Sequence, residues 1–292
     1  MLPLVDIRVH TKISQAELDG KVGRIVTESD YNVRLTGPTR VSMPNGQPIA
    51  IYLPGIIPAE LAEAAYPVLH PIREKTDQRH QASGSQSVKV GTNRKGRNVA
   101  SSILGSFESD EKRFPFCRQT AWTGKHTEQF RELYPLFGFI GERFAEYVPQ
   151  RYRAQWDRAE ATEPAFRIPG TPFTTITVNN TYPTGVHTDK GDLDEGFSCL
   201  AVLRRGDYSG GVFTFPEYRL SVDLQDRDLL LMDAHQWHGN TDIQLHSEDA
   251  ERISLVLYYR TNMLSCGTPS EELAKGKRAS RTNKRVLGEL GA

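Results

Sequence analysis

From residue 172 to residue 259 the chain alternates between short apolar or β-branched runs and clusters of turn-forming residues. The runs that resemble strands are residues 172–179, 197–203, 212–215, 220–224, 229–232 and 253–259. Regular short strands separated by frequent turns predict an antiparallel sandwich or jelly roll. The chain contains neither a GxGxxG nor a P-loop pattern, so nothing in it favours a nucleotide-binding α/β fold.

Two apolar stripes at helical spacing precede these runs. Residues 58–75 predict a helix that starts at Pro58 and that Pro71 ends or kinks. Residues 127–147 predict a second helix, because large apolar side chains recur there every three or four positions. We expect both helices to pack on the sheet, which gives an α+β fold.

The order of these patterns predicts one domain over residues 1–270. It comprises an N-terminal α+β portion, 1–170, and a β core, 171–262. Residues 271–292 are predicted to form a flexible basic tail of the kind that contacts phosphates. Its cations are Lys275, Lys277, Arg278, Arg281, Lys284 and Arg285.

Composition narrows the class of protein. The 292 residues carry 36 Lys and Arg against 36 Asp and Glu, and this balance argues against strong non-specific nucleic-acid binding but permits a local basic patch. The cysteines, Cys117, Cys199 and Cys266, are odd in number and widely spaced, so we expect no disulfide framework and a reducing compartment. No apolar run reaches about 18 residues and the first residues do not resemble a signal peptide. These features predict a cytoplasmic protein that does not contact a membrane.

A possible metal site lies in the β region. His187 and Asp189 are two positions apart, so in an extended segment both side chains point to the same side. A second imidazole must come from another strand, and His235, His238 and His246 are the candidates. We favour His238, because the following Gly-Asn turn can present its side chain into a pocket. Two imidazoles and one carboxylate with open positions are the ligand set of non-haem Fe(II) oxygenases.

A candidate carboxylate-binding arginine lies on the last predicted strand. Arg252 and Ser254 alternate with the apolar Ile253 and Leu255, so they share the face opposite the core. An arginine on such a face suits a ligand carboxylate, which its guanidinium binds through two parallel hydrogen bonds.

From about residue 174 to residue 260 the chain resembles the Fe(II)/2-oxoglutarate-dependent dioxygenases, and most closely the TET/JBP group of nucleic-acid base oxygenases. The resemblance rests on matched motifs, which are Cys117-Arg118-Gln119-Thr120, Asn180, His187-x-Asp189, Gly191-Asp192, Gly210-Gly211, Pro216-Glu217, His238 and Arg252-x-Ser254. One departure is the fourteen-residue spacing from His238 to Arg252, which residues 243–250 lengthen with a polar insert.

The resemblance implies a double-stranded β-helix core and the cofactors Fe(II), 2-oxoglutarate and O₂. It implies that His187, Asp189 and His238 bind the metal and act in catalysis. It also implies that Arg252, Ser254 and Asn180 hold 2-oxoglutarate and that Arg118 contacts the substrate.

A basic loop between the two predicted helices supplies further candidates for substrate binding. Lys89, Arg94, Lys95 and Arg97 lie in a stretch with few apolar residues. Loops of this kind often carry substrate contacts.

The leading hypothesis is therefore a dioxygenase that hydroxylates the methyl group of thymine or 5-methylcytosine in nucleic acid, with DNA as partner. The alternative within the family is a hydroxylase of a free amino acid or another small molecule, which the neutral charge favours. A third hypothesis, from another class, is a cupin-like binding protein or metal-dependent sensor, which the intact ligand set and Arg252 disfavour.

Overall fold

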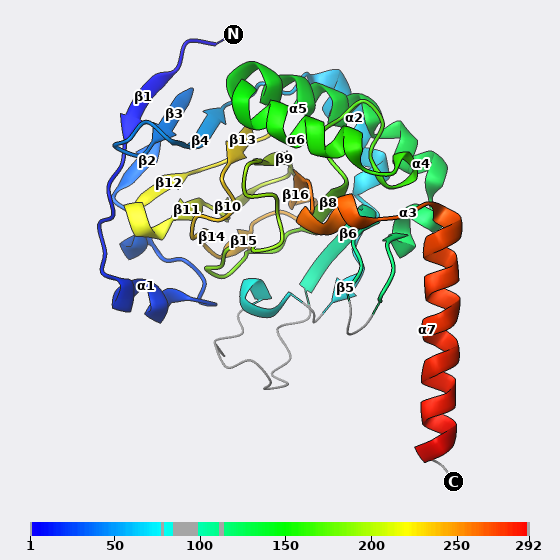
Figure 1. Cartoon of the computed structure of the whole chain (residues 1–292). Helices are drawn as coiled ribbons and strands as arrows, with labels where there is room; N and C mark the ends of the chain where they lie inside the picture. The colour runs from blue at the N-terminus through cyan, green and yellow to red at the C-terminus, as the bar shows by residue number, and fades with distance from the viewer. Residues whose placement is uncertain (1, 77–78, 84–98, 111–113, 291–292) are drawn as a thin grey trace.

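The computed structural model describes residues 2–76, 79–83, 99–110 and 114–290. The chain forms a mixed α/β fold in layers, with helices covering one face of a large sheet and smaller sheets lying on the other side (Figure 1). Single turns of 3₁₀ helix connect the elements at η1 (Glu28–Asp30), η2 (His80–Ser83), η3 (Pro164–Phe166), η4 (Pro216–Tyr218) and η5 (Thr261–Ser265).

The large sheet joins strands from both halves of the chain. Its order is β1 (Val5–Arg8), β3 (Thr39–Ser42), β4 (Pro48–Leu53), β13 (Leu229–Met232), β9 (Ser198–Arg205), β16 (Glu251–Tyr258), β8 (Thr175–Asn180), β6 (Val99–Phe107) and β5 (Lys75–Thr76), with β7 (Arg118–Gln119) beside β6. The pairings are antiparallel except between β1 and β3. The N-terminal portion thus extends the sheet on both sides of the predicted β core.

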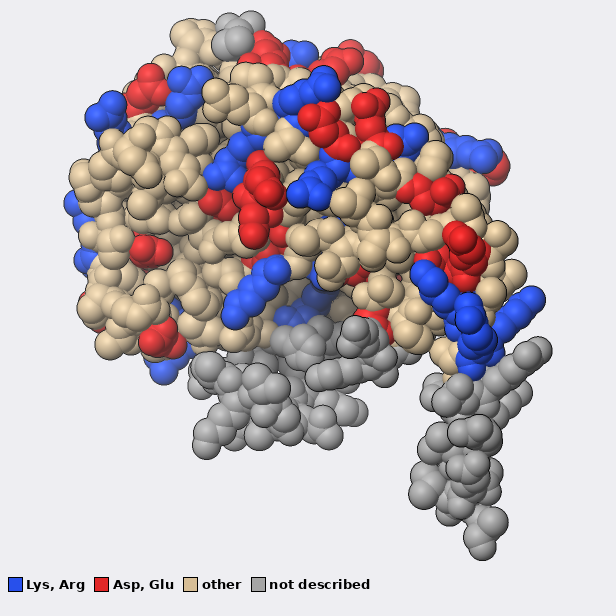
Figure 2. Space-filling model, viewed as in Figure 1, with Lys and Arg blue, Asp and Glu red and all other residues tan. Residues whose placement is uncertain are grey.

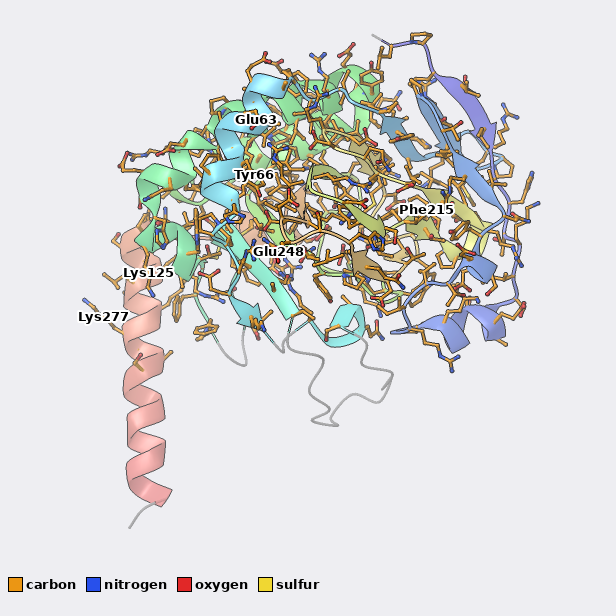
Figure 3. All side chains as sticks on the ribbon, turned by 180° about the vertical axis from the view of Figure 1, so that it is seen from behind. Glu63, Tyr66, Lys125, Phe215, Glu248 and Lys277 are labelled. Atoms are coloured by element: carbon orange, nitrogen blue, oxygen red, sulfur yellow. A yellow bond between two sulfur atoms is a disulfide. The ribbon has the colours of Figure 1, made fainter. Side chains whose placement is uncertain are left out.

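The smaller sheets complete a sandwich. One contains β14 (Gly239–Asn240), β11 (Phe213–Phe215), β12 (Leu220–Val222) and β2 (Val33–Leu35), and the other pairs β10 (Tyr208–Gly210) with β15 (Ile243–Leu245). Apolar side chains from β9 and β13 pack against those from β11 and β12, including Phe215 (Figure 3). Each run of residues that the sequence predicts as a strand contains one, with ends shifted by a few residues.

The helical layer differs from the prediction in detail. The helices are α1 (Gln15–Lys21), α2 (Ala59–Leu69), α3 (Ala121–Lys125), α4 (Thr127–Glu132), α5 (Tyr134–Tyr147), α6 (Pro149–Ala161) and α7 (Pro269–Leu290). The predicted helix over 58–75 ends at Leu69, before Pro71, and Lys75 begins β5. The predicted helix over 127–147 is two helices, because Pro135 has no N–H with which to continue α4 but fits the first turn of α5.

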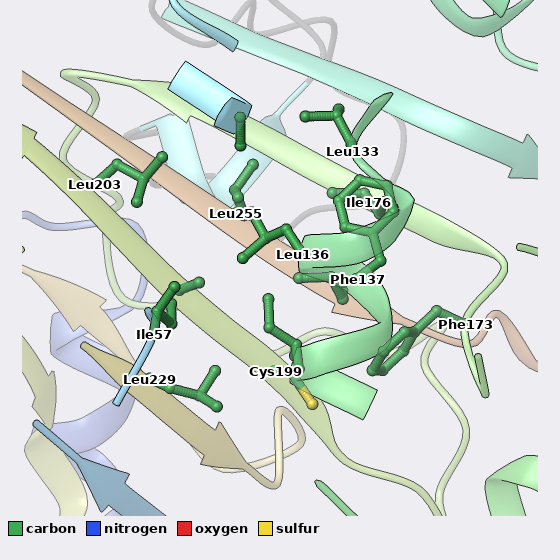
Figure 4. Packing of buried hydrophobic residues seen from close by; sticks show 14 of the residues in the cluster. Ile57, Leu133, Leu136, Phe137, Phe173, Ile176, Cys199, Leu203, Leu229 and Leu255 are labelled. Atoms are coloured by element: carbon green, nitrogen blue, oxygen red, sulfur yellow. The ribbon is translucent and has the colours of Figure 1, made fainter. Parts of the chain in front are cut away.

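Apolar residues of α2, α4 and α5 cover the outer face of the large sheet. Phe137 of α5 packs with Leu255 of β16 and Ile176 of β8 in one buried cluster (Figure 4). On the opposite face Val256 of β16 packs into the sandwich. The alternation along β16 therefore assigns odd-numbered residues to the helices and even-numbered residues, including Arg252 and Ser254, to the sandwich interior.

In the region of the predicted basic tail, residues 269–290 form helix α7, which projects from the body (Figure 1), and the flexibility of this segment stays a prediction. The start of the helix is anchored by Glu272, whose carboxylate accepts the backbone N–H groups of Cys117 and Gly267 at 2.7 and 2.8 Å. Lys and Arg alternate with Asp and Glu over the face shown in Figure 2, as the balanced composition suggests.

The cysteine prediction was wrong. Cys117 and Cys266 form a disulfide with Cα atoms 5.6 Å apart, although 149 positions separate them, and Cys199 is a buried free thiol. Sequence spacing did not reveal the pair because the fold brings the segment before β7 next to the segment that leads into α7. The cysteines therefore lend no support to a reducing compartment, and the cytoplasmic localisation stays a prediction. Among the described residues no helix is long and apolar enough to span a bilayer.

Replacing Cys266 with serine is expected to lower the free energy of unfolding by roughly 2–4 kcal/mol, because the disulfide restricts the unfolded chain. Denaturant titration measures this change. A dithiol reductant should destabilise the unmodified chain to a similar extent and leave Cys266→Ser unaffected. If the reductant does not change the unfolding midpoint of the unmodified chain, the prediction is contradicted.

Candidate active site

His187, Asp189 and His238 converge at the edge of the sandwich. One nitrogen or oxygen of each side chain lies within 4.8 Å of the other two. His187 and His238 exchange both backbone hydrogen bonds, at 2.9 and 3.0 Å, in an isolated antiparallel bridge. The backbone N–H of Asp189 donates to the carbonyl of Ala234 at 3.0 Å. Two distant chain segments are thereby held together, as a metal site with ligands from both segments requires.

Both imidazoles are oriented by backbone carbonyls. Nδ1 of His187 lies 2.8 Å from the oxygen of Gly185, and Nδ1 of His238 lies 2.8 Å from the oxygen of Gln236. An Nδ1 that donates to a carbonyl leaves the lone pair on Nε2. Each Nε2 in turn lies 3.6 Å from an oxygen of Asp189. The three ligand atoms thus face a common point, which suits a small divalent cation.

The protonation of His238 favours metal binding. Burial, reinforced by the neighbouring His187, lowers the pKa of His238 to about 4. The ring is therefore neutral near pH 7, and a metal need not displace a proton from it. The ring of Phe213 stacks against it with centroids 5.5 Å apart and holds its plane.

The two rival histidines lie elsewhere. His235 contacts Asp233 at 3.1 Å and Asp194 at 3.0 Å, and the carboxylate of Asp233 raises its pKa. His246 is exposed and bonds Ser209 at 2.8 Å. Only His238 of the three joins the cluster found among the described residues.

Arg252 is buried on the interior face of β16, two positions from Ser254. Its side chain is 3% exposed, and Nη2 has no hydrogen-bond partner among the described residues. Burial lowers the pKa of this guanidinium below its usual value. A buried donor without a partner is costly, so this nitrogen suits a ligand oxygen.

The Gly210-Gly211 pair makes room for Arg252. Both glycines have positive φ, of 81° and 70°. A Cβ on Gly210 would lie 1.8 Å from the carbonyl oxygen of Asp242, and one on Gly211 would lie 3.1 Å from Cδ of Arg252. The polar insert that lengthens the spacing to Arg252 contains β15, which pairs with β10 just before this turn.

The structure does not bring Asn180 to the interior side of Arg252 and Ser254. Asn180 lies on the helix-facing side of β8, where its amide donates to Glu251. That carboxylate also accepts from Tyr66 of α2 (Figure 3) at 2.6 Å. The neighbouring Asn179 instead faces the interior and lies opposite Ser254 in the sheet register.

Arg118 is also placed away from the metal cluster. Its guanidinium lies over the ring of Phe114, 4.0 Å from the centroid, and donates to the carbonyl of Glu108 at 3.2 Å. It lines a surface cavity of about 680 Å³ beside α7. The remaining candidates for substrate binding, Lys89, Arg94, Lys95 and Arg97, lie outside the described residues.

Sequence reasoning missed a polar row on the interior face. Arg79, Ser101 and Asn179 form a hydrogen-bonded chain that ends opposite Ser254. The alternation of side chains along the strand could have indicated Asn179. Asn179 shares a face with the polar Thr177, whereas Asn180 shares the core face with Ile176 and Val178. Arg79 had no comparable signal, because it precedes a short 3₁₀ turn.

Comparison with known proteins agrees with this geometry. Thymine dioxygenase JBP1 of Leishmania braziliensis is 36% identical over 180 residues, which are 60% of this chain and 21% of the relative. The protein of the same name from Trypanosoma brucei brucei is 31% identical over 237 residues, 80% of this chain and 26% of the relative. The chain thus spans about a fifth to a quarter of the length of these relatives.

A solved structure shares the fold. NgTET1 in complex with 5mC DNA superposes with a TM-score of 0.59 at 14% identity, covering 91% of this chain and all of that one. Residues 106–261 match the model of the Tet_JBP family, described as the oxygenase domain of the 2OGFeDO superfamily. This match covers more than half of the chain and includes the metal cluster and Arg252. The resemblance found in the sequence is confirmed, and the chain belongs to the Tet_JBP family of the 2OGFeDO superfamily.

Proposed function

We propose that this protein is an Fe(II)- and 2-oxoglutarate-dependent dioxygenase that hydroxylates the methyl group of thymine or 5-methylcytosine in DNA. The observation that carries the proposal is the convergence of His187, Asp189 and His238. Arg252 lies buried on the interior face of the same sandwich, and its Nη2 has no hydrogen-bond partner in the part of the chain that the structure describes. The relatives named thymine dioxygenase and the TET structure with 5mC DNA support the choice of substrate.

In this proposal the two facing sheets form a double-stranded β-helix. The strands β13, β9, β16 and β8 are its larger sheet, and β11, β12 and β14 belong to the smaller one. The metal cluster lies where the segment after β8 bridges the segment before β14. The packed apolar core between β9, β13, β11 and β12 leaves the polar end, with β16, β8 and β6, for ligands.

Each residue then has a defined role. His187, Asp189 and His238 hold the iron, and the bound metal with 2-oxoglutarate and O₂ supplies the chemistry that breaks the substrate C–H bond. Arg252 binds the distal carboxylate of 2-oxoglutarate through its guanidinium, and Ser254 adds a hydrogen bond. The interior position of Arg252 excludes water, which strengthens this charge pairing.

The test is product formation with iron, ascorbate and 2-oxoglutarate. We expect succinate together with a hydroxymethyl base when the protein is given duplex or single-stranded DNA containing thymine or 5-methylcytosine. Free amino acids and free nucleosides serve as comparison substrates. Succinate formed equally without DNA, or stimulated only by an amino acid, would contradict the proposal and favour the small-molecule hydroxylase.

If DNA is the substrate, neutralising Lys89, Arg94, Lys95 and Arg97 together is expected to weaken binding. Binding to each phosphate of duplex DNA releases condensed counterions, so the log–log slope of affinity against salt should become shallower by roughly 0.9 for each phosphate that the variant no longer binds. Affinity measured at several salt concentrations tests this, and DNA-independent decarboxylation of 2-oxoglutarate is the control that should not change. Equal slopes for the unmodified and quadruple-variant proteins would show that the loop does not contact phosphates.

A further inference from the structure

Three polar side chains form a directed hydrogen-bond chain on the interior face. Nε of Arg79 donates to Oγ of Ser101 at 2.7 Å, and this hydroxyl donates to Oδ1 of Asn179 at 2.6 Å. Ser101 is 5% and Asn179 is 8% exposed. Nη2 of Arg79 is buried and has no hydrogen-bond partner among the described residues.

The donors and acceptors of this hydrogen-bond chain run in one direction. A guanidinium only donates, so the hydroxyl of Ser101 accepts from Arg79, and the same hydroxyl donates its proton to Oδ1 of Asn179. The oxygen of Asn179 thus faces Ser101, and Nδ2 is the other end of the amide. Nη2 of Arg79 and Nδ2 of Asn179, which make no hydrogen bond to a described residue, are both donors.

Two connections link the residues of this donor pair to the strand that carries Arg252 and Ser254 and to the segment that carries His187. On one side Ser101, Asn179 and Ser254 lie directly opposite one another on β6, β8 and β16. On the other side the turn that follows Arg79 accepts at the carbonyl of Ala82 from Gly185, at 2.8 Å. Gly185 in turn orients the ring of His187.

We propose that Arg79, supported by Ser101 and Asn179, is a specificity-determining residue that donates to a carbonyl oxygen of the substrate base. The inference rests on the proposed function and narrows its substrate. A buried charged donor left unpaired costs more than one that a ligand acceptor satisfies. A ligand with an acceptor next to the reacting methyl group is therefore favoured.

Thymine and 5-methylcytosine differ at this position. The C5 methyl group lies beside C4, which carries an acceptor oxygen in thymine and a donor amino group in cytosine. Two protein donors pair with the thymine oxygen but oppose the amino group of 5-methylcytosine. A site built to hydrogen-bond one group discriminates strongly against an analogue that lacks it. The donor pair thus selects thymine.

The experiment compares two otherwise identical oligonucleotides, one with thymine and one with 5-methylcytosine at the target position, in the unmodified protein and in Arg79→Gln. Glutamine offers an acceptor as well as a donor. The unmodified protein should prefer thymine. In Arg79→Gln, kcat/KM for thymine should fall roughly tenfold to a hundredfold, the range for a lost hydrogen bond from a charged donor, and the thymine to 5-methylcytosine ratio should fall toward one.

Arg131→Gln is the matched control, because Arg131 is exposed on α4 and pairs with Glu128. It should leave the ratio unchanged, and the KM for 2-oxoglutarate should not change in either variant. Ser101→Ala, which removes only the middle hydroxyl, should lower the ratio by a smaller factor and decides the outcome if Arg79→Gln fails to fold. Unmodified protein that prefers 5-methylcytosine, or an unchanged ratio in the folded variants, overturns the inference alone. Failure of the unmodified protein to oxidise either base overturns the proposed function as well.

Discussion

Alanine at His187, Asp189 or His238 is expected to abolish product formation while leaving the fold intact. Each substitution removes one of three protein ligands to the iron, and the loss should exceed the roughly 10- to 100-fold typical of residues that only support a ligand. His187 and Asp189 are partly exposed, so their loss leaves no large internal void. Oxidised base, bound iron and thermal unfolding, measured on the same preparations, test the prediction.

His235→Ala is the matched control. This imidazole lies three positions from His238, but it is bound to Asp233 and Asp194 and its Nε2 does not join the metal cluster. The His235→Ala protein should retain iron and most of the activity. An inactive His235→Ala together with an active His238→Ala would show that the assignment of the distal ligand is wrong.

The sequence predicted the candidate metal site because local geometry suffices there. Two ligands two positions apart point to one side of any extended segment, and the structure brings the side chains of His187 and Asp189 together even though they belong to no long strand. Arg252 and Ser254 follow from the same parity along β16. The choice among three histidines needed more, because the hydrogen-bond partners of His235 come from side chains that a sequence pattern cannot place.

Some of the other features that were not predicted had a signal in the sequence, and others had none. Pro135 was a visible reason to divide the second helix. The turn at Asn45-Gly46 between two β-branched runs was a visible hairpin signal, and β3 and β4 indeed flank it. The disulfide was not predictable, because it depends on how the N-terminal portion wraps around the β core. Extension of the large sheet by β6 and β4 is a long-range pairing of the same kind.

The second large effect is expected at Arg252. Arg252→Ala should nearly eliminate 2-oxoglutarate binding, because truncating one member of a buried charge pair costs about 2–5 kcal/mol, or roughly 30-fold and more in affinity. Arg252→Lys should weaken binding less, because lysine keeps the charge but loses the planar fork that binds both carboxylate oxygens. Titration of 2-oxoglutarate, followed by decarboxylation and by direct binding to the iron-loaded protein, measures both.

Arg205→Ala separates this effect from a general loss of charge near the site. Arg205 lies on the neighbouring strand but faces the helices, where it pairs with Glu63 of α2. Its removal should leave the apparent affinity for 2-oxoglutarate unchanged. A bidentate carboxylate contact requires the affinity for 2-oxoglutarate to rise from alanine to lysine to arginine at position 252. If charge alone held the carboxylate, lysine would bind it as tightly as arginine. An unaltered affinity in Arg252→Ala would mean that another residue holds the carboxylate, and the unsatisfied Nη2 of Arg252 would then need a different ligand.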